Sequence, residues 1–229
     1  MVTAVLLLLL LVASPVFADG VTVVRVTGEA TVSVAPDEAL IDLGVMTENM
    51  NAELAAQENA TKLDSVLGAL RKGFGDSVQV KTLNYSLTPK YSYPQGGGQR
   101  ELDGYTATNV VRVTTAKLDH VGRIVDAATS AGANNVQQLK FRLRDEEPTR
   151  AAALRNATLS ARSKAEAIAQ ALGLKIVSVI SVEEDGVSAA PIEPRMMMMS
   201  ARKSSAPTPV EPGDMHVRAS LTLSVEAGP

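Results

Sequence analysis

The fold is inferred first from residues 148–172, which read PTRAAALRNATLSARSKAEAIAQAL. Acidic residues at 145–147 suit the positive end of a helix dipole, Pro148 suits the first helical position, and Gly173 suits a left-handed cap. Apolar residues recur on one face of a 3.6-residue period, namely Leu154, Ala161, Ala165, Ile168 and Leu172. About 25 residues at 1.5 Å each give roughly 37 Å. We therefore expect one long Ala-rich helix packed across a β-sheet.

The remaining sequence predicts strands in adjacent pairs and two further helices. Helices are expected at 51–72 and 118–131, and strands at 21–34, 39–45, 78–93, 104–115, 136–143, 175–182 and 215–225. The order, roughly ββαββαβαββ, favours mostly antiparallel sheets and the α+β class. We expect one domain over 19–229, with sub-halves 19–115 and 116–229 and a flexible Pro-, Ser- and Met-rich loop at 185–214.

The first 18 residues read as a signal peptide. Val5 to Ala13 is an apolar run rich in leucine, and Val16-Phe17-Ala18 approximates a small-x-small cleavage site. A membrane anchor is the alternative, but the run is shorter than the roughly 20 residues of a spanning helix. No Lys or Arg precedes the leucines, which is unusual for a signal. We expect cleavage near Ala18 and a periplasmic protein.

The composition excludes several kinds of partner. With no cysteine, an exported chain has neither disulfides nor a lipid-bearing cysteine. The net charge of −3 argues against non-specific nucleic-acid binding and against anionic membrane surfaces. No later stretch is long and apolar enough to span a membrane, so only a peripheral association with the envelope or outer membrane stays open.

A series of short motifs extends across some 190 residues. They lie at 26–30, 35–39, 81–82, 87–91, 104–107, 111–113, 131–133, 141–143, the Ala-rich helix and Pro212-Gly213-Asp214. In this order they resemble the SIMPL-domain family of bacterial periplasmic proteins. The family often has Gly at the position of Ala30 and Glu at that of Asp214, and both departures are mild.

The resemblance implies an α+β periplasmic protein that needs no cofactor and has no established catalytic activity. Family members are linked to oxidative-stress tolerance and are often antigenic, and the family supplies no catalytic residues to transfer. Our expectation is a non-enzymatic protein that self-assembles as a homo-oligomer and supports envelope stress tolerance. The alternative is a periplasmic module that binds a ligand or a metal.

Few residues suggest site chemistry. His120 and His216 lie far apart, so a histidine-based metal or hydrolase site would need them to converge with other groups. The acidic runs 145–147 and 183–185 lack the spacing of a calcium loop and read as a helix cap and a solvated turn. The run Met196, Met197, Met198 and Met199 is a candidate metal or redox site, because thioethers bind Cu(I) and are oxidised by peroxide. A flexible packing role for these methionines is favoured.

The four tyrosines are the expected oligomer interface: Tyr85, Tyr91, Tyr93 and Tyr105. The first three share one face of a strand that would run about 50 Å at 3.3 Å per residue, far beyond a usual strand. Either Pro89 bends it or the hairpin projects with an aromatic face toward a partner. The alternative is that these tyrosines cover the core of their own subunit.

Overall fold

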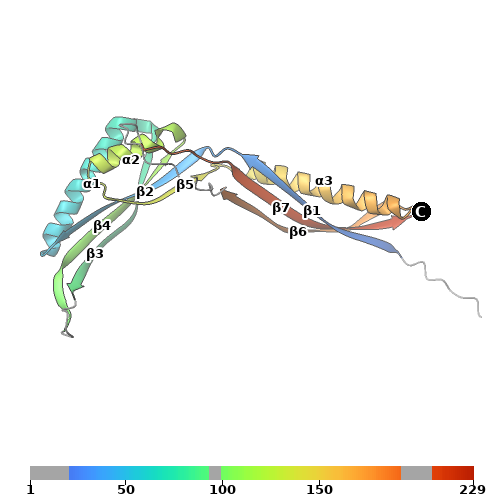
Figure 1. The fold of residues 1–229 in the computed structure, drawn as a ribbon, viewed down its shortest axis with the longest axis horizontal. Helices are drawn as coiled ribbons and strands as arrows, with labels where there is room; N and C mark the ends of the chain where they lie inside the picture. Colours follow the sequence, from blue (N-terminus) through green and yellow to red (C-terminus); the bar gives the residue numbers. More distant parts are fainter. Residues whose placement is uncertain (1–20, 93–98, 192–207) are drawn as a thin grey trace, which may run out of the picture. The chain divides into compact units, whose positions relative to one another are not determined.

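The fold is seen in a computed structural model that describes residues 21–92, 99–191 and 208–229. Within these ranges, seven strands and three α-helices follow the order ββαββαβαββ, which confirms the predicted α+β class (Figure 1). The elements form two compact units that interleave along the chain. Unit 1 comprises the residues up to Glu29, Ala157–Asp185 and Ser220–Pro229, and unit 2 comprises Ala30–Asn156 and Gly186–Ala219. The sequence predicts one boundary between two sub-halves, after residue 115. The two units of the structure instead alternate along the chain and have four boundaries.

Unit 2 contains a four-stranded antiparallel sheet in the order β3-β4-β2-β5. The strands are β2 (Glu38–Asn49), β3 (Gln79–Ser92), β4 (Glu101–Thr115) and β5 (Asn135–Arg142). Two helices, α1 (Ala52–Phe74) and α2 (Val121–Ser130), pack against one face of it (Figure 1), and short 3₁₀ turns stand at Gly75–Ser77 and Leu118–His120. The core between them consists mainly of β-branched and Leu side chains.

Helix α1 begins where local chemistry predicts. The Asn51 side chain accepts hydrogen bonds from the backbone N–H groups of Glu53 and Leu54, which have no partner inside the helix. Val66 and Leu70 are buried against the sheet, as the apolar pattern predicts. Leu54 is about half exposed, whereas Ala55 and Asn59 are fully buried on the same helix.

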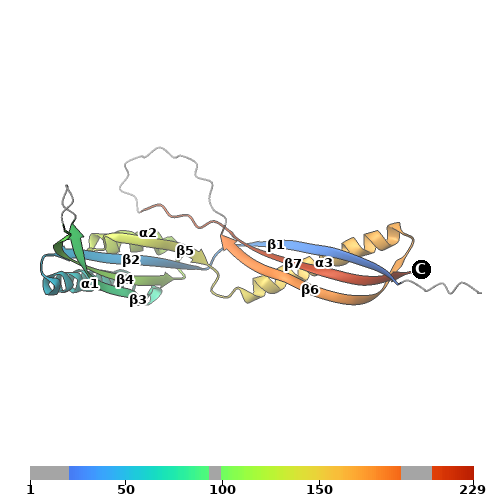
Figure 2. The same cartoon turned by 90° about the horizontal axis from the view of Figure 1, so that it is seen from below.

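A second sheet has the order β1-β7-β6, from β1 (Thr22–Val34), β7 (Met215–Gly228) and β6 (Lys175–Pro191). Helix α3 (Glu147–Ala171) crosses one face of this sheet (Figure 2). The strand predicted at 215–225 is confirmed, and its alternate residues Val217, Ala219, Leu221, Leu223 and Val225 are all buried. This central strand therefore carries the core beneath the helix.

The buried face of α3 differs from the predicted stripe. It consists of alanines four residues apart, Ala153, Ala157, Ala161, Ala165 and Ala169. Ile168 and Leu172, which the periodicity placed on the buried face, are exposed. The reason is a close approach of β1: a Cβ on Gly28 would lie 2.1 Å from the backbone O of Ala157 and 2.6 Å from the Cβ of Ala161. Larger side chains do not fit at that distance.

Strand β6 extends further than predicted. It continues to Pro191 rather than ending at Val182, so residues 185–191 of the expected loop belong to a strand instead. Gly186 lies within the strand at φ +133°, a conformation that favours glycine. The described chain resumes at Thr208, whose N–H and Oγ1 donate to the carboxylate of Asp126 on α2.

Candidate functional site

Strand β6 forms one edge of the sheet in unit 1 and carries exposed apolar side chains. An edge strand has backbone N–H and C=O groups directed away from its sheet and available to another strand. Four aliphatic residues of β6 are each more than half exposed, namely Val177, Val179, Ile180 and Val182. Natural edge strands usually carry charges or Pro that discourage pairing, and residues 176–182 of β6 contain neither, so this part of the edge has the features of a docking surface.

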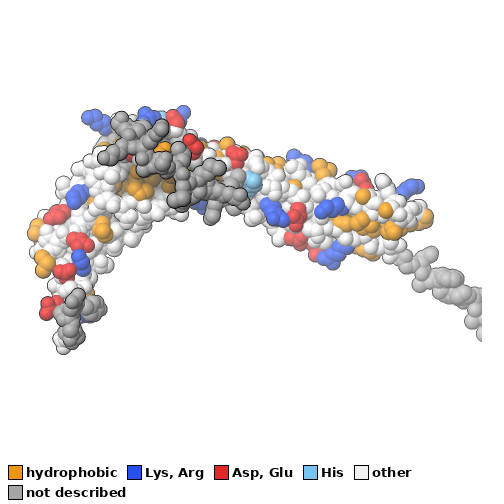
Figure 3. Space-filling view, viewed as in Figure 1, with side chains coloured by type: hydrophobic (Ala, Val, Ile, Leu, Met, Phe, Trp, Pro, Cys, Tyr) orange, Lys and Arg blue, Asp and Glu red, His pale blue; other side chains and the backbone are white. Residues whose placement is uncertain are grey.

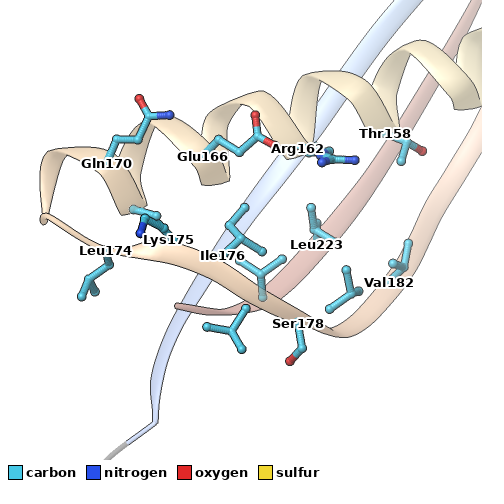
Figure 4. Close-up of a pocket in the computed structure, with 14 residues that line it drawn as sticks. Thr158, Arg162, Glu166, Gln170, Leu174, Lys175, Ile176, Ser178, Val182 and Leu223 are labelled. Atoms are coloured by element: carbon cyan, nitrogen blue, oxygen red, sulfur yellow. Dashed lines mark hydrogen bonds and ion pairs between the residues drawn. The ribbon is translucent and has the colours of Figure 1, made fainter. Parts of the chain in front are cut away.

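A groove of about 700 Å³ lies between β6 and helix α3 (Figure 4). It exists because the alanine face of α3 packs toward β1 and β7, where side chains are buried, while the described side chains of β6 are only half-buried or exposed. Val177, Val179 and Leu223 supply apolar lining, and Arg162 and Glu166 of the helix form an ion pair at 2.8 Å along its wall. Figure 3 shows hydrophobic side chains gathered along this part of unit 1. We call this the β6 groove.

The side-chain alternation of β6 shifts within the strand. Ser178 Oγ lies 2.9 Å from Glu226 Oε2, and Thr222 Oγ1 donates to Asp185 Oδ2 at 3.2 Å. Both partners are even-numbered residues of β7, so Ser178 and Asp185 lie on the same sheet face although their parity differs. In agreement, Ser178 points away from the helix in Figure 4, while Val182 lies on the groove side. Val177, Val179 and Val182 all line the β6 groove.

Charges of opposite sign stand at the two ends of this apolar stretch. Lys175 begins the strand, and Glu183, Glu184 and Asp185 follow the last aliphatic residue. Glu183 is 3.6 Å from Arg25, and Asp185 accepts hydrogen bonds from Ser220 and Thr222. The acidic run was expected to be a solvated turn, and the structure instead places it within the strand.

Three of the tyrosines predicted as an interface lie on described strands of unit 2, Tyr85 and Tyr91 on β3 and Tyr105 on β4. Tyr85 and Tyr91 are both substantially exposed, and the Arg100 guanidinium sits 4.5 Å from the ring centroid of Tyr91. Tyr105 is half-buried on β4, and Tyr93 lies outside the described residues. Strand β3 is continuous through Pro89, with pairing irregularities near Leu83 and Lys90. The interface role of these tyrosines stays a prediction.

Lys90 is held beside Tyr91 by two carboxylates. Its Nζ lies 2.6 Å from Glu48 Oε2 and 3.7 Å from Asp103 Oδ2. The hydrogen bond to Glu48 is the main cause that raises the pKa of Lys90 above its ordinary value. The ammonium therefore stays charged at neutral pH and fixes the outer part of the hairpin against β2.

The other sequence candidates do not form a catalytic or metal site in the described part of the chain. His216 Nε2 is 3.5 Å from Ser33 Oγ, whereas His120 packs against the ring of Phe74. Among the described residues, no three His, Asp or Glu side chains converge in a way that would hold a metal ion. Met196–Met199 lies outside these residues, so its metal or redox role stays a prediction.

Two buried carboxylates on β2 were not identified from the sequence. Asp42 accepts two hydrogen bonds of 2.7 Å from Arg112, which raise the pKa of that arginine. Glu38 pairs with Arg142 and lies 3.5 Å from Arg144. Each carboxylate is neutralised by arginine, an arrangement that suits structural ion pairs rather than acid–base catalysis. The sequence places opposite charges on the predicted strands, which could have suggested such ion pairs. It does not give the strand register, so it cannot show which charges lie opposite each other.

No helix in the described ranges is both long and apolar enough to cross a membrane.

Comparisons with known proteins agree with the resemblance read from the motifs. The chain is 23% identical over 211 residues to the 26 kDa periplasmic immunogenic protein of Brucella melitensis, covering 89% of this chain and 84% of that protein. It is 28% identical over 182 residues to the uncharacterized protein YggE of Edwardsiella ictaluri, covering 80% and 75%. It is 25% identical over 183 residues to YggE of Escherichia coli K12, covering 80% and 73%. The model of the SIMPL family, described as a protein of unknown function (DUF541), matches residues 24–225, and the chain therefore belongs to this family.

Proposed function

We propose that this chain is an exported, non-enzymatic periplasmic protein that self-assembles through strand β6 and supports envelope stress tolerance. The observation that carries the proposal is the exposed aliphatic edge of β6 next to an open apolar groove. Burial of such a surface between two copies removes apolar area from water and satisfies the free backbone groups of both edges.

The sequence of β6 is complementary to itself in an antiparallel pairing. When Lys175 lies opposite Glu184 of a second copy, Val177 lies opposite Val182 and Val179 lies opposite Ile180. A two-fold axis repeats each of these pairs, so one symmetric contact joins six matched residues from each copy. Val177, Val179 and Val182 all line the β6 groove, so this pairing brings apolar side chains of the two copies together beside it.

Two further observations support the proposed periplasmic location and the proposed role in stress tolerance. Residues 1–18 have the pattern of a secretory signal, and one relative in Brucella is named a periplasmic immunogenic protein. The SIMPL resemblance implies a link with oxidative stress and antigenicity. The buried carboxylates Asp42 and Glu38 are each paired with an arginine and so are not available for catalysis. This suits a protein that acts through its surface.

Light scattering of residues 19–229 tests self-assembly. We expect the wild-type mass to be at least twice that of one chain. Val179→Lys should give the mass of a single folded chain, because a charge at the centre of the pairing is buried without a partner. Leu159→Lys is the matched control, since Leu159 is about as exposed as Val179 but lies on α3, outside the groove lining.

A single-chain mass for the wild type across the concentration range contradicts assembly. An unchanged oligomer in Val179→Lys contradicts assembly through β6 and directs attention to the tyrosine hairpin. There, substitution of Tyr91 and Tyr93 by Ser should give folded monomers if these residues form the interface, and an unfolded protein if they cover their own core.

The stress role is tested by complementation. A strain lacking the gene should survive peroxide less well than its parent. Wild type and Leu159→Lys should restore survival, and Val179→Lys should not if assembly is needed. Equal rescue by all three proteins would separate stress tolerance from assembly, and unaltered survival of the deletion strain would reject the stress role.

A further inference from the structure

A cavity of about 440 Å³ lies in unit 2 between helix α1 and strands β3 and β4. Its helical wall is a stripe of α1 at the spacing i, i+4, i+7, i+11, formed by Glu53, Gln57, Ala60 and Asp64. Its other wall contains Tyr85 and Asn109, which face each other across the β3–β4 ladder. The volume is within the range of small-molecule sites.

The floor of this cavity contains a fully buried asparagine with an unused acceptor. The Asn59 Nδ2 donates to the backbone O of Val45 at 2.8 Å and of Ala107 at 3.0 Å. These two carbonyl acceptors fix the orientation of the amide, because a flipped amide would set its oxygen against both of them. Oδ1 of Asn59 is buried and, among the described residues, receives no hydrogen bond.

A second amide oxygen in the same cavity also lacks a hydrogen-bond donor. Oδ1 of Asn109 is buried and has no donor within the described part of the chain. A buried acceptor without a donor is destabilising, so a ligand that brings N–H or O–H donors to both oxygens is favoured in this cavity.

The charges of the lining select the ligand further. The nine described lining residues include two carboxylates, Glu53 and Asp64, and no Lys, Arg or His. The two acids are 11 residues apart, about 16 Å along a helix axis. The exposed ring of Tyr85 adds a face that attracts cations. Acceptors thus occur at both ends and in the middle of an elongated site.

We propose that this cavity binds a linear aliphatic polyamine. The internal ammonium of such an amine is secondary and donates two hydrogen bonds, which suits the two amide oxygens on the floor, while the terminal ammonium groups lie toward Glu53 and Asp64. The methylene segments between them lie against Leu63 and the Tyr85 ring. A calcium ion fits less well, because Ca²⁺ takes six to eight oxygen ligands and the described acids do not converge.

Calorimetric titration of residues 19–229 with spermidine at physiological salt tests the proposal. We expect saturable binding of one spermidine per chain, with butylamine and CaCl₂ binding at least about tenfold more weakly. Asn109→Val should lose at least about tenfold in affinity, because it removes one buried acceptor of a charged donor. The thermal stability of the same variant should be unchanged or higher, because the unsatisfied oxygen is gone.

Charge variants separate this site from non-specific attraction to an acidic protein. Glu53→Gln and Asp64→Asn should each weaken spermidine binding by about two- to fivefold, as expected for exposed ion pairs. Glu58→Gln is the matched control on α1, since that carboxylate accepts from Asn49 and does not line the cavity.

Three outcomes would overturn the proposal: no saturable binding, equal affinity in Asn109→Val, or tighter binding of Ca²⁺ than of spermidine. Equal losses in Glu58→Gln and Glu53→Gln would also overturn it, by indicating non-specific attraction. The monomeric Val179→Lys protein should bind spermidine as wild type does, so the failure of the amine site and the failure of β6 assembly are independent results.

Discussion

At the scale of single residues, Gly28 sets the distance between strand β1 and helix α3. The space that a Cβ would occupy is filled by the backbone of Ala157 and the side chain of Ala161. Neither a backbone carbonyl nor an alanine methyl group can rotate away. Any residue other than glycine must therefore push the helix off the strand.

We predict that Gly28→Ala lowers the free energy of unfolding by about 3 kcal/mol, at the upper end of typical overpacking effects. Gly68→Ala on α1 is the control, because a Cβ there meets nothing within 4 Å. The control should raise stability by up to about 1 kcal/mol through helix propensity. Urea unfolding measures both. Equal stability of Gly28→Ala and wild type would show that the helix is not held this close to β1.

At the scale of elements, the same close contact explains why the predicted buried face of α3 is confirmed at Ala161 and Ala165 but wrong at the larger residues. The prediction from periodicity placed the large apolar residues Leu154, Ile168 and Leu172 on the buried face. The close contact between β1 and α3 instead leaves room only for small side chains. Helix α3 is buried through alanines and exposes Ile168 and Leu172.

We predict that Ala165→Ile destabilises the protein by about 1–3 kcal/mol, because the added atoms have no room against the sheet. Ile168→Ala should change stability by about 0.5 kcal/mol or less, as for other exposed positions. Thermal unfolding distinguishes the two faces. The reverse order of effects would favour the stripe predicted from the sequence.

Other elements were predictable because local signals agree with the tertiary structure. The Asn51 cap, the alternation of β7 and the bounds of α3 within one residue all follow from local chemistry. The end of β6 does not, because its Glu-Glu-Asp-Gly run has loop composition and is held in the strand by hydroxyl groups of β7. Asn59 was missed as well, although a polar residue between the buried Ala55 and Val66 of α1 was an available signal.

At the scale of the whole molecule, charge should control whether two copies associate. The proposed pairing brings Lys175 of each copy beside Glu184 of the other, so the symmetric contact contains this pair twice. Exposed ion pairs each contribute a fraction of a kcal/mol, and their effect falls with salt.

We predict that Lys175→Glu weakens the dimer by about tenfold at low salt, because both pairs become repulsive. Adding Glu184→Lys to the same chain should restore the wild-type affinity, since the exchanged charges again lie opposite each other. Sedimentation equilibrium at low and high salt measures the dissociation constants. A double variant no stronger than Lys175→Glu would contradict this register of β6.

The strand order of unit 1 also governs when that unit can form during synthesis. Its central strand is β7, the last strand of the chain, and β7 separates β1 from β6. Strands β2 to β5, in contrast, all lie between Glu38 and Arg142. A chain emerging from its N-terminus can thus complete the sheet of unit 2 early, whereas β1 waits unpaired until residues 215–228 arrive. A nonsense codon that removes only those residues would take away the middle of one sheet and leave every strand of the other in place.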